Sequence, residues 1–176
     1  SINQNHQKEL LLGLFMTETK DLQIGEQAPA FSTKDSEGNL ISLADFSAEG
    51  KTVVLYFYPK DNTPGCTIQA CDFRDNMERL SSNDVVVLGI SKDSEKSHQN
   101  FINKQSLNFS LLMDEDLEIH EKYNVWKEKS MYGKKYMGTL RSTFIIDAEG
   151  IIKFAGYNVK AKGHAELILN ELNIED

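Results

Sequence analysis

The chain has 176 residues, of which 40% are apolar and 26% are charged, and its formal net charge is −8. This length suits one globular domain with a full-sized core, and the negative charge argues against nucleic acid or an anionic membrane as a partner. No apolar run approaches the roughly 18 residues that span a bilayer, and the chain has only 2 cysteines, which is not the disulfide framework of a small secreted protein. A reducing cytoplasm and reactive thiols fit this composition better.

The first 20 residues are expected to be an extension ahead of one domain that covers residues 21–176. The apolar run 10–16 is short for the core of a signal sequence and lacks a small-residue cleavage site. A short helix packed on the domain, or a loose tail, is therefore favoured over a targeting role. Met16 could equally be the natural start, with the residues before it added.

Apolar runs and turn signals predict the elements of the first half in order. Residues 31–35 and 40–43 flank a Gly-Asn turn and predict a hairpin. The run 52–58 is almost entirely β-branched, aromatic or leucine, which predicts a central strand buried on both faces. A helix from about Cys66 to Leu80 and a second buried strand over 85–91 follow it.

The middle of the chain is more polar. It predicts a helix over 94–105, a short strand over 108–113 and a helix of one to two turns over 115–123. Residues 127–141 are polar and basic and predict a long loop. That loop is either a solvated surface segment or the rim of an active site.

The last elements complete an α/β pattern. The runs 142–147 and 151–155 flank a Glu-Gly turn and predict a second hairpin, and residues 164–172 predict a closing helix with Leu167, Ile168 and Leu172 on one face. Two parallel strands joined through a helix, followed by an antiparallel hairpin and a last helix, indicate a thioredoxin-like fold. Its central mixed sheet is flanked by helices, and the first hairpin extends it at the N-terminus.

Cys66 falls where a buried strand gives way to a helix. Unpaired N–H groups and the positive end of the helix dipole favour an anion there, and the thiolate is the nucleophilic form of cysteine. Arg141 opens the strand expected beside residues 52–58, so its guanidinium would favour the thiolate further.

The segment before Cys66 is also suited to a reactive site. Pro59 has no N–H and can wall a pocket, and the hydroxyl of Thr63 can both donate and accept a hydrogen bond. Taken singly, Cys66 is more often a buried small apolar residue, Thr63 a helix cap and Arg141 a surface charge. Their joint presence is what indicates a site.

The spacing of the two cysteines limits how they can pair. In a regular helix, residues five apart have Cα atoms about 8–9 Å apart, whereas a disulfide needs roughly 7 Å or less. Cys66 and Cys71 can therefore bond only if the first helical turns unwind. A reduced form is predicted to have a helix that continues through Cys71.

The joint pattern Pro59-x-x-x-Thr63-x-x-Cys66, with Arg141 ahead of an apolar strand, resembles the active site of peroxiredoxins. Longer runs are similar to the bacterioferritin comigratory protein, or Q-type, subfamily; they are residues 57–66, 70–75, 123–126 and 157–163. The resemblance extends over about residues 20–173.

The resemblance implies a thiol-dependent peroxidase for hydrogen peroxide and organic hydroperoxides. Cys66 would be the peroxidatic cysteine and Cys71 the resolving cysteine of an intramolecular disulfide. Pro59, Thr63 and Arg141 would shape and polarise the peroxide pocket. Thioredoxin or a similar dithiol would be the reductant, no metal or organic cofactor is implied, and a monomer is favoured over a dimer.

The two cysteines also allow other functions. A dithiol–disulfide exchange protein would not need Pro59, Thr63 and Arg141, and a non-catalytic holdase or binding module would not consume peroxide. Zinc binding and a Cys–His hydrolase are disfavoured, because the four histidines show no ligand spacing and none is tied by a motif to Cys66. Each histidine is expected at the surface, and Trp126 is expected to serve packing.

Overall fold

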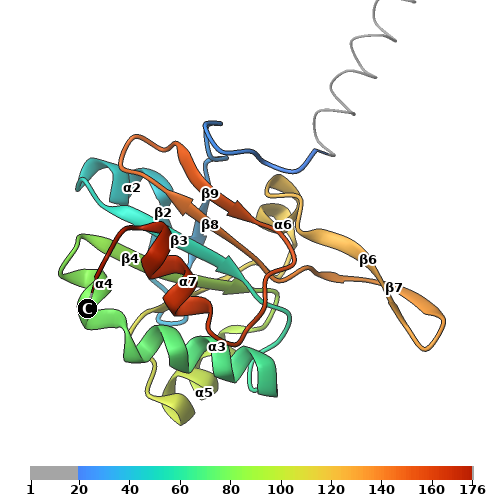
Figure 1. Ribbon diagram of the computed structural model, residues 1–176. Coiled ribbons are helices and arrows are strands. Elements are labelled where there is room, and N and C mark those ends of the chain that lie inside the picture. The colour runs from blue at the N-terminus through green and yellow to red at the C-terminus, as the bar shows by residue number, and fades with distance from the viewer. Residues whose placement is uncertain (1–19, 176) are drawn as a thin grey trace, which may run out of the picture.

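The computed structural model describes residues 20–175, and a five-stranded mixed sheet lies at its centre (Figure 1). The strand order is β5-β4-β3-β8-β9, with β3, β4 and β5 parallel and β8 and β9 antiparallel to their neighbours. These strands are β3 (Thr52–Phe57), β4 (Val85–Ser91), β5 (Ser110–Met113), β8 (Ser142–Ile146) and β9 (Ile152–Gly156). The predicted thioredoxin-like fold is confirmed.

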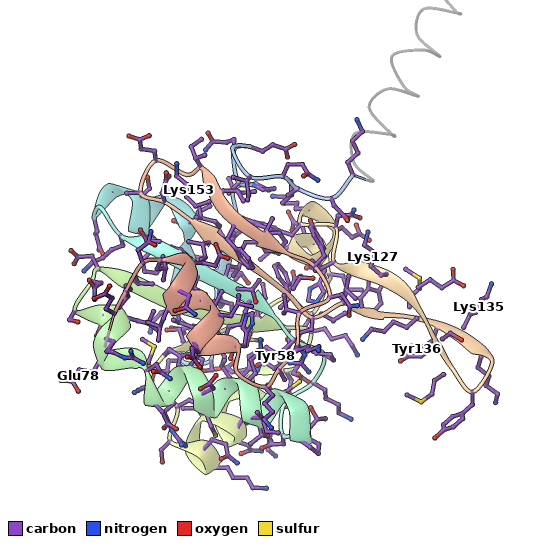
Figure 2. The ribbon with its side chains drawn as sticks, viewed as in Figure 1. Tyr58, Glu78, Lys127, Lys135, Tyr136 and Lys153 are labelled. Carbon is purple, nitrogen blue, oxygen red and sulfur yellow. The ribbon has the colours of Figure 1, made fainter. Side chains whose placement is uncertain are left out.

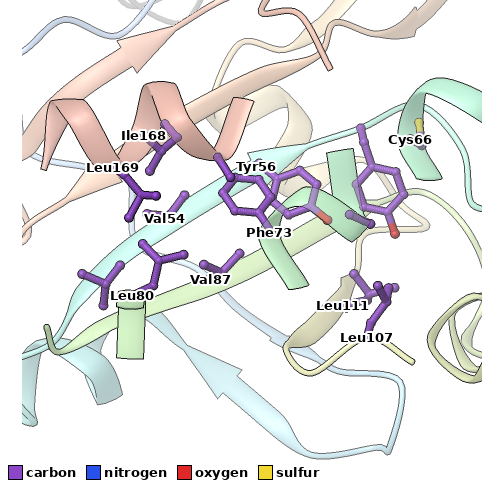
Figure 3. Packing of buried hydrophobic residues seen from close by; sticks show 14 of the residues in the cluster. Val54, Tyr56, Cys66, Phe73, Leu80, Val87, Leu107, Leu111, Ile168 and Leu169 are labelled. Carbon is purple, nitrogen blue, oxygen red and sulfur yellow. The ribbon is translucent and has the colours of Figure 1, made fainter. Parts of the chain in front are cut away.

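The residues of β3 alternate between two apolar cores, as the two-residue period of a strand requires. Val54 and Tyr56 face a core closed by α3 (Pro64–Asp75), α4 (Met77–Ser81), α5 (Glu95–Gln105) and α7 (His164–Glu171). Val53, Leu55 and Phe57 face the other core, to which α2 (Leu43–Ala48) and α6 (Glu118–Lys122) contribute. Figure 3 shows the first core, with Cys66 at its edge. A strand buried on both faces was predicted and is found.

The N-terminal hairpin is also confirmed. It consists of β1 (Ser32–Lys34) and β2 (Leu40–Ser42), which pair antiparallel. The helix over 94–105 is found as α5, where the side chain of Ser94 caps the N-terminus by accepting a hydrogen bond from the amide of Ser97.

The single helix predicted from Cys66 to Leu80 is wrong in its extent. The helix begins two residues earlier, at Pro64, and Asn76 (φ −109°, ψ 6°) separates α3 from α4. The side chain of Asn76 donates a 2.8 Å hydrogen bond to the carbonyl of Asp72, competing with the backbone for a helical acceptor. Apolar spacing does not reveal such a break.

The long loop predicted over 127–141 is wrong. Residues in this range form a two-stranded hairpin, β6 (Trp126–Met131) and β7 (Lys134–Thr139), which projects from the body of the protein (Figure 1). Its turn is Tyr132-Gly133, and both residues have positive φ (51° and 79°), as the tight turn of a two-residue hairpin needs. The strands pair with each other and pack little on the core, so their sequence has no apolar alternation.

The face predicted for the closing helix is only partly right. Ile168 is buried and Leu172 packs against the core, but Leu167 is exposed and Leu169 is buried instead. The helix begins at His164 and points residues 164, 165, 168 and 169 inward. Residues 1–19, on which the N-terminal expectations fall, lie outside the described part of the chain; within that part, no helix is long and apolar enough to cross a membrane.

Candidate active site

Cys66 lies in the first turn of α3, the helix that follows β3, the central strand of the sheet. Pro64 opens the helix, where its missing N–H costs nothing, because the first amides of a helix have no acceptor within it. The side chain of Cys66 is only 2% exposed. The unpaired amides and the dipole of α3 therefore act on a sulfur that is largely shielded from water.

Arg141 reaches this sulfur from the start of the neighbouring strand, β8. It lies between β7 and β8, and the pairing of Ser142 with Phe57 brings it to the end of β3, where the loop to Cys66 begins. Its Nη2 is 3.4 Å from Cys66 Sγ. A guanidinium at this distance stabilises a thiolate by its charge and by hydrogen bonding. The predicted meeting of Arg141 and Cys66 is found.

Gln69 holds the guanidinium in place and was not singled out from the sequence. Arg141 Nη1 donates a hydrogen bond to Gln69 Oε1, and the side chain of Gln69 is fully buried one turn after Cys66. Its position three residues after the cysteine, on the same helix face, is the signal that could have found it. Gly65 also serves this contact, because a Cβ there would lie 3.3 Å from Arg141 Nη2.

Thr63 and Pro59 lie in the loop that joins β3 to α3. Thr63 occupies the N-cap position of α3, but its side chain makes no capping hydrogen bond. Its hydroxyl instead donates to the carbonyl of Lys60 at 2.7 Å. The hydroxyl proton is thereby used, so in this state the oxygen of Thr63 can only accept a hydrogen bond from a ligand. Pro59 is half-buried at the start of the loop.

Cys71 lies in the same unbroken helix as Cys66. Both cysteines are free, Cys71 is half-buried, and its Sγ donates a 3.5 Å hydrogen bond to Oε1 of Gln105 in α5. The prediction that a reduced form has a helix continuing through Cys71 is confirmed.

Comparison with known proteins decides the family. The profile of the AhpC/TSA family matches residues 24–155. The chain belongs to this family. It is 49% identical over 151 residues to a putative peroxiredoxin bcp of Coxiella burnetii, covering 86% of this chain and 99% of that protein. It is 46% identical over 151 residues to peroxiredoxin Bcp of Escherichia coli strain K12, covering 86% and 96% of the two chains.

Solved structures agree with the sequence relatives. The PrxQ C47S mutant of Xylella fastidiosa matches with a TM-score of 0.82 at 36% identity, over 88% of this chain and 97% of that one. The bacterioferritin comigratory protein of Xanthomonas campestris, studied for its alkyl peroxide reduction activity, matches with a TM-score of 0.76 at 39% identity, over 81% and 90%. This peroxiredoxin is thus a thiol-dependent peroxidase, with a peroxide as substrate and a thiol as reductant.

The expectation that the histidines lie at the surface is wrong for the three in the described residues. His98, His120 and His164 are all buried, with 2% exposure or less. Each has a specific hydrogen-bond partner that offsets the loss of water, which the sequence does not reveal.

His98 ties the loop before Cys66 to the body of the peroxiredoxin. Its Nε2 lies 2.8 Å from the carbonyl of Leu112, which can only accept, so this nitrogen carries a proton. Its Nδ1 lies 2.7 Å from Asp61 Oδ2, and Asp61 also accepts hydrogen bonds from the hydroxyls of Tyr58 and Ser97. Burial alone would lower the pKa of His98, but the hydrogen bond and charge of Asp61 outweigh it and raise this pKa above its ordinary value.

Asp61, Asp93 and His98 also form a group whose ligand-type atoms lie within 4.8 Å of one another. Asp93 Oδ2 accepts from the amide of Asp61 at 2.9 Å and from the hydroxyl of Ser91 at 2.6 Å. The atoms of this group are thus hydrogen-bonded to one another and to neighbouring groups of the protein. We interpret it as a hydrogen-bond network that anchors the loop 59–63.

The other two histidines hydrogen-bond the strands on either side of Arg141. His120 bonds Asp114 through Nδ1 at 2.6 Å and Thr139 through Nε2 at 2.9 Å, and Thr139 ends β7 two residues before Arg141. His164 Nε2 bonds the hydroxyl of Thr143 in β8 at 2.8 Å. Burial, and then the positive charge of Arg141, lower the pKa of His164 to about 4, so this side chain is neutral at physiological pH.

Proposed function

We propose that Cys66 is the peroxidatic cysteine of this enzyme. Its thiolate attacks one oxygen of the peroxide, the O–O bond breaks, and the other oxygen leaves as water or an alcohol after taking up a proton. Cys66 becomes a sulfenic acid, the first and reversible step of cysteine oxidation. The observation that carries this proposal is the 3.4 Å contact of Arg141 Nη2 with Cys66 Sγ in the first turn of α3.

The roles of the neighbouring residues follow from their donors and acceptors. Arg141 stabilises the thiolate and then the negative charge that develops on the leaving oxygen. The hydroxyl of Thr63 donates its hydrogen bond to the carbonyl of Lys60. Its oxygen therefore accepts a hydrogen bond from the peroxide O–H and so orients the peroxide. Pro59 walls the pocket without offering a donor that would compete with the substrate.

Cys71 is proposed to resolve the sulfenic acid. Its thiol condenses with the Cys66 sulfenic acid, forming one S–S bond and releasing one water. The helix must unwind for this step, since residues five apart in a regular helix cannot bridge. Thioredoxin or a similar dithiol then reduces the disulfide, becoming a disulfide itself, and the helix re-forms.

The chain has only two cysteines and both are free, which suits the reducing environment of the cytoplasm. We propose that residues 21–176 form one thioredoxin-like peroxiredoxin domain, that the protein is a monomer in the cytoplasm, and that hydrogen peroxide and organic hydroperoxides are both substrates. No metal, organic cofactor, nucleic acid or membrane surface is needed for this chemistry.

Peroxide consumption by wild type and both cysteine variants, driven by a thioredoxin system, tests the proposal. Cys66→Ser should abolish turnover, and its survival would contradict the assignment of Cys66. Cys71→Ser should reduce about one peroxide per chain and then stop. After one equivalent of peroxide, non-reducing mass analysis of wild type should show the loss of two hydrogens within one chain, and an unchanged mass would rule out the intramolecular step.

A further inference from the structure

The β6–β7 hairpin concentrates exposed apolar side chains in a way that the rest of the described surface does not. Four of the eight exposed large apolar residues of the described chain lie within seven positions of this hairpin. They are Met131 (56% exposed), Tyr132 (101%), Tyr136 (43%) and Met137 (51%). Clusters of this kind on a soluble protein mark interaction sites.

The fold does not account for the residue at the tip. Tyr132 has φ 51°, a left-handed conformation that costs a bulky residue about 1–2 kcal/mol and that Asn or Gly adopts more easily. Its side chain is fully exposed, so no packing compensates for that cost. A contact made outside this chain is a direct reason to place an aromatic ring there.

The hairpin is also basic on an acidic protein. It carries four lysines and one glutamate, whereas the rest of the chain has 15 basic and 26 acidic residues. An acidic macromolecule is therefore repelled by most of the surface and attracted to this part of it. Figure 2 shows Lys127 near the base of the hairpin and Lys135 and Tyr136 further out along it.

The two faces of the hairpin differ. Paired residues of neighbouring strands lie on the same face, so the register assigns each side chain to one of them. One face, which we call the basic face, has Lys127, Lys129, Met131, Lys134 and Tyr136. On the opposite face Glu128 lies 3.9 Å from Lys135, beside Met137, and Trp126 and Thr139 contact the buried His120.

The basic face lies close to the catalytic residues. Lys129 interacts electrostatically with Arg141 and with Cys66, and partial burial followed by the charge of Arg141 lowers its pKa. β7 itself ends at Thr139, two residues before Arg141. On α3, Ile68 lies between the two cysteines and is 52% exposed, which offers a second apolar contact close to the site of the disulfide.

We propose that the basic face of the β6–β7 hairpin is the docking surface for the acidic dithiol protein that reduces this enzyme. The inference rests on the proposed function, in which such a protein must reach a disulfide between Cys66 and Cys71. Its acidic surface meets the lysines, Met131 and Tyr136 supply apolar contact area, and its dithiol faces the pocket. A second copy of this chain is less favoured as the occupant, because a two-fold symmetric dimer would place the lysines of the basic face against the same lysines of the other copy.

Steady-state kinetics with two reductants test the docking surface. The probes are a thioredoxin of net negative charge, kept reduced by its reductase, and the small dithiol dithiothreitol, which needs no docking surface. Met131→Ser on the basic face is compared with Met137→Ser on the opposite face, and Lys134→Glu is compared with Lys135→Glu. The two methionines have similar exposure, and the two lysine substitutions make the same change of charge.

We expect Met131→Ser and Lys134→Glu each to lower kcat/KM for thioredoxin about fivefold, and Met137→Ser and Lys135→Glu less than about twofold. The thioredoxin reaction of wild type should weaken as salt is raised, and turnover with dithiothreitol should be unchanged in all four variants. Equal effects on both faces, or equal effects with both reductants, would overturn the proposal. So would a shift from dimer to monomer in light scattering on Met131→Ser, since the face would then join two copies.

The outcomes also separate this inference from the proposed function. If peroxide turnover is absent with both reductants in wild type, or persists in Cys66→Ser, the proposed function itself fails. If Cys66-dependent turnover is present with both reductants and the hairpin variants do not alter it, the docking surface alone fails.

Discussion

The thiol of Cys71 is hydrogen-bonded to the side-chain oxygen of Gln105, 3.5 Å away in the neighbouring helix α5. Gln105 also accepts a 2.6 Å hydrogen bond from Arg74 Nη1 through its backbone carbonyl, so α3 is fastened to α5 on both sides of Asp72. Asp72 itself accepts a hydrogen bond from the amide of Ala165 in α7 at 2.8 Å. The hydrogen bond between Cys71 and Gln105 therefore has to break before Cys71 can reach Cys66.

Gln105→Ala should speed the formation of the disulfide. The substitution removes the side-chain acceptor of Cys71 and leaves the backbone bond to Arg74 in place, and a hydrogen bond contributes about 0.5–1.5 kcal/mol. Disulfide formation after one equivalent of peroxide should then be roughly 2–10-fold faster. Rapid acid quench followed by mass analysis measures it.

The same helix offers a control. Gln99→Ala removes a side chain that bonds the carbonyl of Ser36, away from both cysteines, and should leave the rate unchanged. A Gln105→Ala rate equal to wild type would show that the Cys71–Gln105 contact does not limit resolution.

Arg141→Gln should slow the reaction of Cys66 with peroxide. The variant removes the cation that contacts Cys66 Sγ and leaves Gln69 without its buried donor. Charge-assisted hydrogen bonds of this kind contribute about 1.5–3 kcal/mol, so the second-order rate constant should fall about 10–150-fold. Competition with catalase for a limiting amount of hydrogen peroxide measures it, and a rate within a factor of two of wild type would exclude this role for Arg141.

His98→Asn should destabilise the loop that carries Thr63. It removes the positive partner of the buried Asp61 carboxylate, and breaking a buried pair in this way costs about 3–5 kcal/mol. Urea unfolding at pH 6 measures the loss. His98 has a raised pKa in the fold, so its contribution is complete below the ordinary value near 6.5 and is lost as pH rises through the raised value. The difference between variant and wild type should therefore shrink toward alkaline pH, and a difference that grows with pH would contradict the charged state of His98.

His164→Asn should change the response to acid. The pKa of His164 is lowered from 6.5 to about 4 in the folded protein. Between these two pH values His164 is therefore protonated in the unfolded chain but neutral in the folded one. The contribution of the neutral form is present above pH 6.5 and declines as pH falls toward 4, by roughly 3 kcal/mol in total. Urea unfolding between pH 7 and pH 4.5 should show a shallower loss of stability in the variant, and parallel curves would contradict the prediction.

The strands of the central sheet and the meeting of Cys66 with Arg141 could be predicted from the sequence. Thr52–Phe57 is a continuous apolar run, and such runs form strands buried on both faces. Once this strand is placed at the centre of the sheet, the loop to Cys66 and the neighbouring strand after Arg141 are placed at its end. The hairpin β6–β7 could not be predicted in this way, because its strands pair with each other and bury little, so their sequence carries no alternation. The break at Asn76 depends on one side-chain hydrogen bond rather than on spacing.

The residues proposed to react with peroxide could be predicted from the sequence, but the residues that hold them in position could not. Cys66, Thr63 and Pro59 are close in sequence, and Arg141 opens a strand whose neighbour could be inferred. Gln69, and the anchoring of the loop by Asp61 and His98, depend on contacts between α3, α5 and the sheet. A histidine buried beside a carboxylate has no distinct signature in a single sequence, because surface histidines occur beside the same residues.

The burial of Cys66 bears on how large a molecule can be and still react with its sulfur. Only 2% of the surface of Cys66 is accessible. We therefore expect a small peroxide to reach its sulfur more readily than a bulky disulfide or alkylating reagent does. Cys71 is half-buried and does not have this shielding. Steric access would then favour small peroxides over larger electrophiles and limit the disulfide exchange that an exposed thiolate undergoes.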